Sequence, residues 1–142
     1  MYDYKAKKVV AVLSSTLETG IAMNVLGHMC VALGAHGDKD AMMGRPVLTD
    51  ASGLDHIGIG RYAVIITKVK PARLRQFIEE ARAVPSLKLI DFPQEMLDTH
   101  HDDDLVSSMA AKAEKDMSYL GALVFGDAAE IHALSGKFML WK

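Results

Sequence analysis

Apolar residues in this chain occur in two patterns, continuous runs rich in β-branched residues and stretches with a three- to four-residue period. The first run covers residues 7–14, and three similar runs cover residues 62–67, 87–92 and 119–125. Continuous apolar runs are typical of strands that are covered on both faces of a sheet. The sequence therefore predicts four strands, with residues 138–141 as a candidate closing strand.

Two main helices are predicted between these runs. The first, residues 21–35, carries one apolar stripe, formed by Ala22, Val25, Leu26, Met29, Ala32 and Leu33. The second begins at Pro71, whose missing N–H costs nothing in the first turn of a helix, and ends before Pro85. Its inward positions have the same period: Leu74, Phe77, Ile78 and Ala81. The alternation predicts an α/β fold, a three-layer α/β/α sandwich with a small mixed sheet of about four strands, in a single domain.

Two segments depart from the alternation. Residues 36–60 are punctuated by glycines and a proline, and we expect a long irregular excursion, of the kind that is usually functional. Residues 93–118 form a polar insertion that we expect to be helical. The apolar positions of this insertion are Val106, Met109, Ala110 and Ala113. Residues 126–134 are expected to form a short helix before the end of the chain.

Composition narrows the class of protein without indicating its activity. Half of the 142 residues are hydrophobic and 24% are charged, which is ordinary for a globular domain and excludes wholesale disorder. The net charge of −2 gives no general signal for binding polyanions. The charges are nevertheless segregated, because residues 1–90 are net basic and residues 91–142 are net acidic.

The cysteine and hydropathy patterns bear on location. The single cysteine, Cys30, cannot form a disulfide within the chain, which fits a reducing compartment. The apolar stretch Val9–Leu13 is shorter than the core of a signal peptide, and no stretch is long enough to span a bilayer. We therefore expect a cytoplasmic protein with no membrane partner.

Two stretches resemble the type-2 peptidyl-tRNA hydrolases, small α/β enzymes that release peptides from tRNA. The apolar strand Val9–Leu13 leads to Gly20, and a helix places His28 eight positions later, as in that family. Residues 126–141 resemble the family's closing segment: a glycine, a short acidic helix, a Thr/Ser-Gly turn and a final apolar strand. The resemblance implies the same fold. Within it, the chain looks like a diverged member, similar to a bacterial domain-of-unknown-function family grouped with these hydrolases.

The chain departs from those hydrolases at the residues of their proposed active site. The family's lysine after the glycine is Ile21 here, and its glutamine one helical turn later is Val25. Its Asp-Leu after the first strand is replaced by Ser14-Ser15, and its Asp-Ala-Gly-x-Thr signature keeps only Asp91. An isoleucine supplies neither the charge nor the hydrogen bonds of a lysine. A module without the catalytic lysine therefore fits better than a working peptidyl-tRNA hydrolase.

A candidate site lies where the first strand meets the first helix. Asn24 and His28 are four residues apart, hence on one face of the helix, and ligands usually bind at the carboxyl ends of strands in open α/β sheets. We expect His28, Asn24 and Asp91 as the catalytic candidates. A ligand-binding group is expected in the loop that follows the strand: Ser14, Ser15, Thr16 and Gly20. The alternative is that His28 is a packed histidine satisfied by a backbone carbonyl.

A second group of polar residues raises the question of a metal. His100-His101 is followed by Asp102–Asp104, and imidazole with carboxylate suits zinc or manganese. Three aspartates at the start of a helix are also stabilised by its dipole. We therefore expect a solvated helix start, with no metal and no cofactor.

Two other features have simple structural explanations. Lys68, Lys70, Arg73 and Arg75 could contact phosphates, but they also fit the outer face of an amphipathic helix. Cys30 is expected to be a small buried hydrophobe rather than a nucleophile.

Two functions of different classes remain. The first is a non-enzymatic module that binds a small ligand or a protein. The second is a hydrolase of an ester or amide bond, peptidyl-tRNA-like, with a site rebuilt around Ser14, Asn24, His28 and Asp91. The missing lysine and signature favour the first, and the acidic insertion would repel tRNA, which is a disfavoured partner. We also expect a homodimer, because methionine-rich surfaces adapt to partners and two-fold dimers are the commonest assembly.

Overall fold

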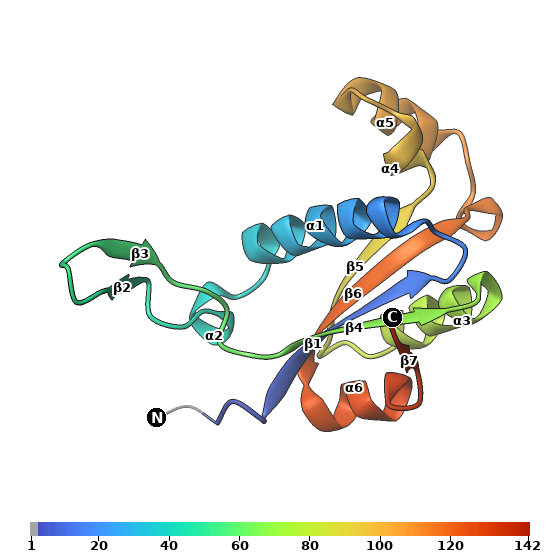
Figure 1. Ribbon diagram of the computed structural model, residues 1–142. Coiled ribbons are helices and arrows are strands. Elements are labelled where there is room, and N and C mark those ends of the chain that lie inside the picture. Colours follow the sequence, from blue (N-terminus) through green and yellow to red (C-terminus); the bar gives the residue numbers. More distant parts are fainter. Residues whose placement is uncertain (1–2) are drawn as a thin grey trace.

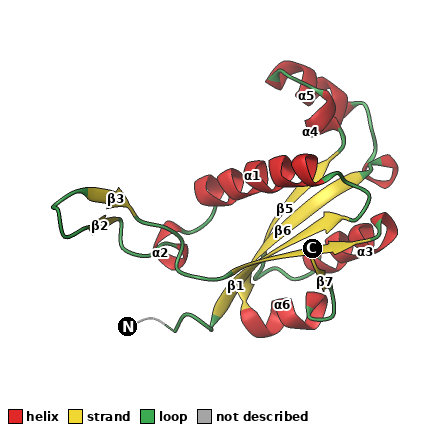
Figure 2. Ribbon diagram, in the orientation of Figure 1, coloured by secondary structure: helices red, strands yellow, loops and turns green. Residues whose placement is uncertain are grey.

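The computed structural model describes residues 3–142 and shows a mixed sheet with helices on both faces (Figures 1 and 2). The strands of the main sheet are β1 (Lys7–Ser14), β4 (Val64–Val69), β5 (Lys88–Pro93), β6 (Tyr119–Asp127) and β7 (Met139–Leu140). A separate two-stranded sheet contains β2 (Val47–Thr49) and β3 (Asp55–Ile57). The helices are α1 (Thr19–His36), α2 (Lys39–Met42), α3 (Pro71–Arg82), α4 (Glu95–Asp98), α5 (Asp102–Ala110) and α6 (Ala128–Ser135), with a 3₁₀ helix η1 (Glu114–Asp116).

The main sheet has the strand order β5-β6-β1-β4-β7. β1 pairs in parallel with β4 and antiparallel with β6, and β5 is antiparallel to β6. The carboxyl ends of β1, β4 and β5 therefore meet at one edge. The α/β sandwich is confirmed, but the sheet has five strands rather than four, because β7 pairs with β4 through Thr67 and Lys68. A strand of two residues is too short to give a clear pattern in the sequence, so residues 138–141 could be predicted only as a candidate strand.

The helix α1 forms one outer layer. Four positions of its predicted stripe are buried, and two are half-buried: Ala22, Val25, Met29 and Leu33, then Leu26 and Ala32. They pack on side chains of the central strands, among them Leu13 and Leu123. Gly121 lets the helix lie close to β6, since a Cβ there would be 2.9 Å from Leu13 Cδ2 and 3.1 Å from Met29 Cε.

The helices α3 and α6 form the other outer layer. All four predicted inward positions of α3 are fully buried: Leu74, Phe77, Ile78 and Ala81. They pack with Val10 and Val12 of β1 and Ile131 of α6. The sheet is thus covered on both faces, as its continuous apolar strands predict.

The segment 36–60 is more ordered than the sequence indicates. After the short helix α2, the strands β2 and β3 form a hairpin that extends away from the sheet (Figure 1). Gly53 allows the connecting turn, because its φ is +84°, a left-handed conformation that favours glycine. Strands of three residues are too short to show a two-residue alternation, so the prediction of an irregular excursion was wrong here.

The insertion after β5 is helical, as predicted, and contains α4, α5 and η1. Its apolar positions do not form a core, because Val106, Ala110 and Ala113 are exposed. Across residues 3–142, no helix is long and apolar enough to cross a membrane.

Candidate functional site

A pocket of about 340 Å³ lies between α1, β5 and the inserted segment α4–α5. Its apolar lining comes from Met29, Ala32, Ile90, Phe92, Met96 and Leu105. Its polar lining comes from His28, Asp91, Thr99, His100, His101 and Asp102. Three imidazoles from two distant segments of the chain therefore share one hollow with an apolar lining.

His28 projects from the exposed edge of α1. Its ring lies beside Phe92, with 6.2 Å between ring centroids and a tilt of 48°, a favourable distance for an aromatic pair. Phe92 is itself buried against the α1 core. The phenyl ring thus gives the imidazole a fixed apolar support, while the exposed part of His28 remains available to a ligand.

His100 and His101 immediately precede α5. His101 caps the helix, and its carbonyl accepts a hydrogen bond from the Leu105 N–H at 3.0 Å. Asp102, Asp103 and Asp104 occupy the first turn, where the positive end of the helix dipole stabilises carboxylates. The helix start is as predicted. Within residues 3–142, no group of three His, Cys, Asp or Glu side chains is arranged to hold a metal ion.

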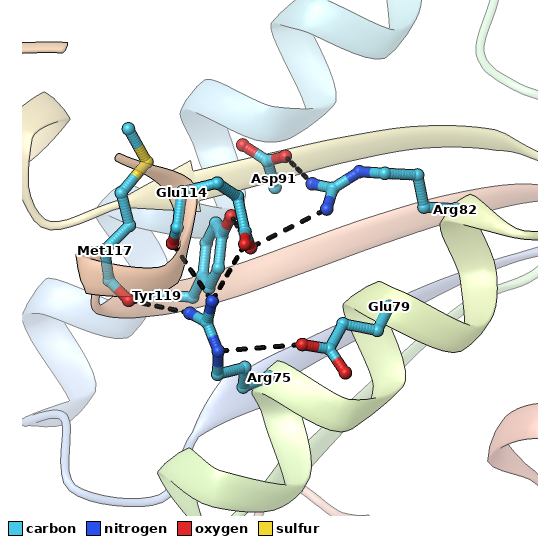
Figure 3. Close-up of polar contacts among 7 residues, drawn as sticks. All are labelled: Arg75, Glu79, Arg82, Asp91, Glu114, Met117 and Tyr119. Carbon is cyan, nitrogen blue, oxygen red and sulfur yellow. Dashed lines mark hydrogen bonds and ion pairs between the residues drawn. The ribbon is translucent and has the colours of Figure 1, made fainter. Parts of the chain in front are cut away.

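The carboxylate of Asp91 is directed away from His28. Ile90 and Phe92 pack on the α1 side of β5, and Asp91 between them turns toward α3. There its Oδ2 accepts a hydrogen bond from Arg82 Nη2 at 3.1 Å, and Figure 3 shows this contact. His28 and Asp91 both line the pocket, but the Asp91 carboxylate pairs with the Arg82 guanidinium rather than with the His28 imidazole.

The remaining candidates lie outside this pocket. Ser14 is buried, and its hydroxyl is 2.8 Å from the Thr16 hydroxyl. Ser15, Gly20 and Asn24 are exposed, and none of them lines the pocket that contains His28. The structure thus brings His28 and Asp91 to the pocket, and leaves the other predicted residues outside it.

Most of the basic group at the start of α3 is engaged within the molecule. Arg75 donates hydrogen bonds to the Met117 carbonyl at 2.9 Å and to the Glu114 carboxylate at 2.9 Å (Figure 3). Arg73 pairs with Glu80 at 3.4 Å, and the ammonium of Lys68 lies 5.5 Å from the centroid of the Trp141 ring system. These contacts support the structural explanation of the basic group.

Cys30 is exposed rather than buried, so the expectation of a buried hydrophobe was wrong. It lies on the side of α1 that faces away from the sheet, next to Val31. Partial burial raises the pKa of its thiol and thus favours the protonated form.

Sequence reasoning did not predict that His28 and the pair His100-His101 belong to one pocket. It placed His28 at the end of β1 and treated His100-His101 only as a helix start or a metal motif. The histidines lie close together because the insertion folds back from β5 toward α1. The spacing of residues along the sequence does not predict this packing. The run of two histidines at a helix start was the available signal.

The chain is similar to a known family and to a solved structure, and neither has a described activity. A family model described as "Protein of unknown function (DUF2000)" matches residues 7–142. A solved structure of a protein of unknown function, Atu0240 from Agrobacterium tumefaciens strain C58, aligns with a TM-score of 0.81 at 15% identity and covers 100% of both chains. This likeness shows a shared fold. No curated protein matches the chain.

Proposed function

Because this chain belongs to the DUF2000 family, whose description states no function, we propose its role from the pocket: a module that binds a small molecule between α1, β5 and the insertion. The observation that carries the proposal is the convergence of His28, His100 and His101 on one hollow. A volume of about 340 Å³ lies within the range of small-molecule sites, roughly 300–1,000 Å³. Apolar walls with a few polar groups are also typical of such sites.

The charges around the pocket restrict the class of ligand. Imidazole nitrogens can donate or accept hydrogen bonds, so the three rings suit carbonyl and hydroxyl groups. Asp102 lines the pocket, and Asp103 and Asp104 follow it in the same helical turn. These carboxylates would repel a phosphate-rich ligand. We therefore assign to the pocket a small, uncharged, amphipathic molecule whose apolar body contacts Met29 and Phe92.

The resemblance to type-2 peptidyl-tRNA hydrolases stays a prediction, and the contacts around His28 do not favour a hydrolase. A hydrolytic site built on the predicted residues would need His28 close to Ser14 or to the Asp91 carboxylate. Ser14 instead contacts Thr16, and Asp91 pairs with Arg82. These contacts favour binding without hydrolysis, and the acidic insertion disfavours tRNA as a ligand.

The methionines provide probes for this proposal. Met29 and Met96 line the pocket, while Met139 is exposed on β7 and lies outside it. We would label the methionine methyl groups with carbon-13 and screen a library of small uncharged fragments by NMR. The proposal predicts hits that shift Met29 and Met96 together and leave Met139 unchanged. A library that produces no hits, or hits that shift only methionines elsewhere, would contradict it.

A further inference from the structure

The side of α1 that faces away from the sheet is apolar and uncovered. We define the outer face of α1 as Gly20, Met23, Gly27, Cys30, Val31 and Gly34, all of which are exposed. Met23 is 66% exposed and Val31 is 74% exposed. Residues 19–35 contain no Asp, Glu, Lys or Arg. Asn24 and His28 are exposed along one edge of this face, and its remaining side chains are apolar. An exposed apolar patch of this kind is typical of an interaction surface, and it lacks a cover within the described chain.

Packing within the described residues does not require the glycines of this face. Glycine in the interior of a helix destabilises it relative to alanine. At Gly20, Gly27 and Gly34 an added Cβ would meet no atom within 4 Å. Nothing within residues 3–142 therefore requires glycine at these positions, whereas a second backbone lying close to α1 would.

The hairpin is the second uncovered apolar element. We define the arm as residues 44–61, which contain β2 and β3 and extend from the body of the molecule (Figure 1). Val47 and Ile57 form a cross-strand pair and are 51% and 89% exposed. Leu48, Leu54 and Ile59 are also exposed. A hairpin of two short strands is at best marginally stable by itself in water, so the arm needs a surface to pack on.

The two carboxylates of the arm have partners within it. Asp50 is 3.0 Å from the His56 ring, and Asp55 accepts a hydrogen bond from the Thr49 hydroxyl at 2.7 Å. The exposed aliphatic side chains of the arm therefore remain available to pack against another surface.

A second pocket connects the two uncovered elements. It has a volume of about 210 Å³ and a mostly apolar lining that includes Cys30 and Gly34 from the outer face, Met43 and Gly60 at the base of the arm, and Phe125 from the sheet. An aliphatic side chain from another molecule would find an apolar hollow at this junction.

We propose that a second copy of this chain covers the outer face of α1 with its own arm, and that the two copies exchange arms reciprocally about a two-fold axis. The same chain carries both surfaces, so a reciprocal contact covers both at once, as a two-fold interface requires. The arm and the outer face together supply roughly 25 residues per copy, which falls within the 20 to 30 residues a side of a stable interface.

Sedimentation velocity of the full chain tests this arrangement. The proposal predicts a species of twice the chain mass. It also predicts that Val31→Asp on α1 and Ile57→Asp on the arm each raise the dissociation constant at least tenfold. Both positions are exposed, so the subunit fold is expected to remain intact, with an unchanged circular dichroism spectrum. Val106→Asp on α5, at a residue that is 66% exposed, is the matched control and leaves the dimer intact. A monomeric wild-type protein, or a dimer that neither variant weakens, overturns the proposal.

Disulfide trapping tests the contact itself, because Cys30 is the only cysteine of the chain. In Ile57→Cys, mild oxidation is expected to produce a linked dimer in which residue 57 of one copy is joined to Cys30 of the other, as identified by peptide mass spectrometry. A dimer joined only through Cys30 to Cys30, or no linked dimer, overturns the exchange of arms.

Discussion

Glu95 is the acidic residue that the fold buries most deeply, with 4% of its surface exposed among residues 3–142. One carboxylate oxygen, Oε1, accepts a hydrogen bond from the Lys112 ammonium, and the other has no partner in the described chain. This bond lowers the pKa of Glu95 below its ordinary value of 4.5. The pair joins α4 to the segment after α5, and thus fixes the helices that carry one side of the pocket.

The Glu95–Lys112 pair predicts a pH-dependent stability. Because the folded-state pKa of Glu95 is depressed, the pair stabilises the fold above about pH 4.5 and this contribution is lost as the pH falls through the lowered pKa. Lys112→Met is therefore expected to lower the melting temperature at neutral pH, and the difference from wild type is expected to shrink in acid. The measurement is thermal unfolding followed by circular dichroism from neutral to acidic pH. A difference that stays constant with pH would show that the pair does not supply the effect.

Single residues show where sequence reasoning succeeds and where it stops. The stripe of α1 was predicted correctly, since burial of Val25 and Met29 follows from helical periodicity alone. The partner of Asp91 was not predicted, because Arg82 belongs to another element. The direction of the Asp91 carboxylate depends on the face of β5 that it occupies. Periodicity identifies the buried side of an element; it does not identify the residue across from it.

At the scale of elements, α3 holds the end of the insertion in place. Arg75 contacts Glu114 and Met117, and Arg82 lies 3.7 Å from Glu114, so two turns of one helix bind the segment around η1 (Figure 3). The Tyr119 hydroxyl also donates to Glu114 Oε1 at 2.9 Å. The contacts fix the point where the insertion returns to the sheet.

Removal of Arg75 is expected to loosen that segment selectively. In Arg75→Met the Met117 carbonyl and the Glu114 carboxylate each lose a donor, so the amides of residues 112–118 are expected to exchange with deuterium faster than in wild type. The core strands are expected to keep their protection, since local opening does not require global unfolding. Arg73→Met on the same helix is the matched control. Hydrogen exchange read by mass spectrometry checks the result, and unchanged exchange at 112–118 would show that other contacts hold the segment.

Elements also differ in how well they could be predicted. The long ones, residues 7–14 and 71–82, follow from run length, periodicity and proline. The hairpin of β2 and β3 was not predicted, because strands of three residues have no measurable period and depend on pairing with another strand. The strand β7 was predicted only as a candidate within residues 138–141, and its pairing with β4 could not be predicted. The exposed hairpin and the place of the last strand in the sheet therefore became known only from the structure.

At the scale of the molecule, the segregation of charge has a structural explanation. Basic residues of the first part of the chain pair with acidic residues of the second: Lys7 with Asp127, Arg75 with Glu114, and Arg82 with Asp91. The acidic excess remains around α5, beside the pocket. The insertion lines one side of the pocket. Under the proposed function its negative charge would repel phosphate, which would connect the composition of the chain to its ligand.

The most direct test of the binding proposal is isothermal titration calorimetry with the tightest fragment found by NMR. Wild type, His28→Ala and His36→Ala would be compared, since His36 lies on the same helix, is exposed and does not line the pocket. We predict that His28→Ala weakens binding at least tenfold with an unchanged melting temperature, because its ring is partly exposed and contributes little to the core, and that His36→Ala binds as wild type does. Equal affinity for all three proteins would contradict a ligand site at His28.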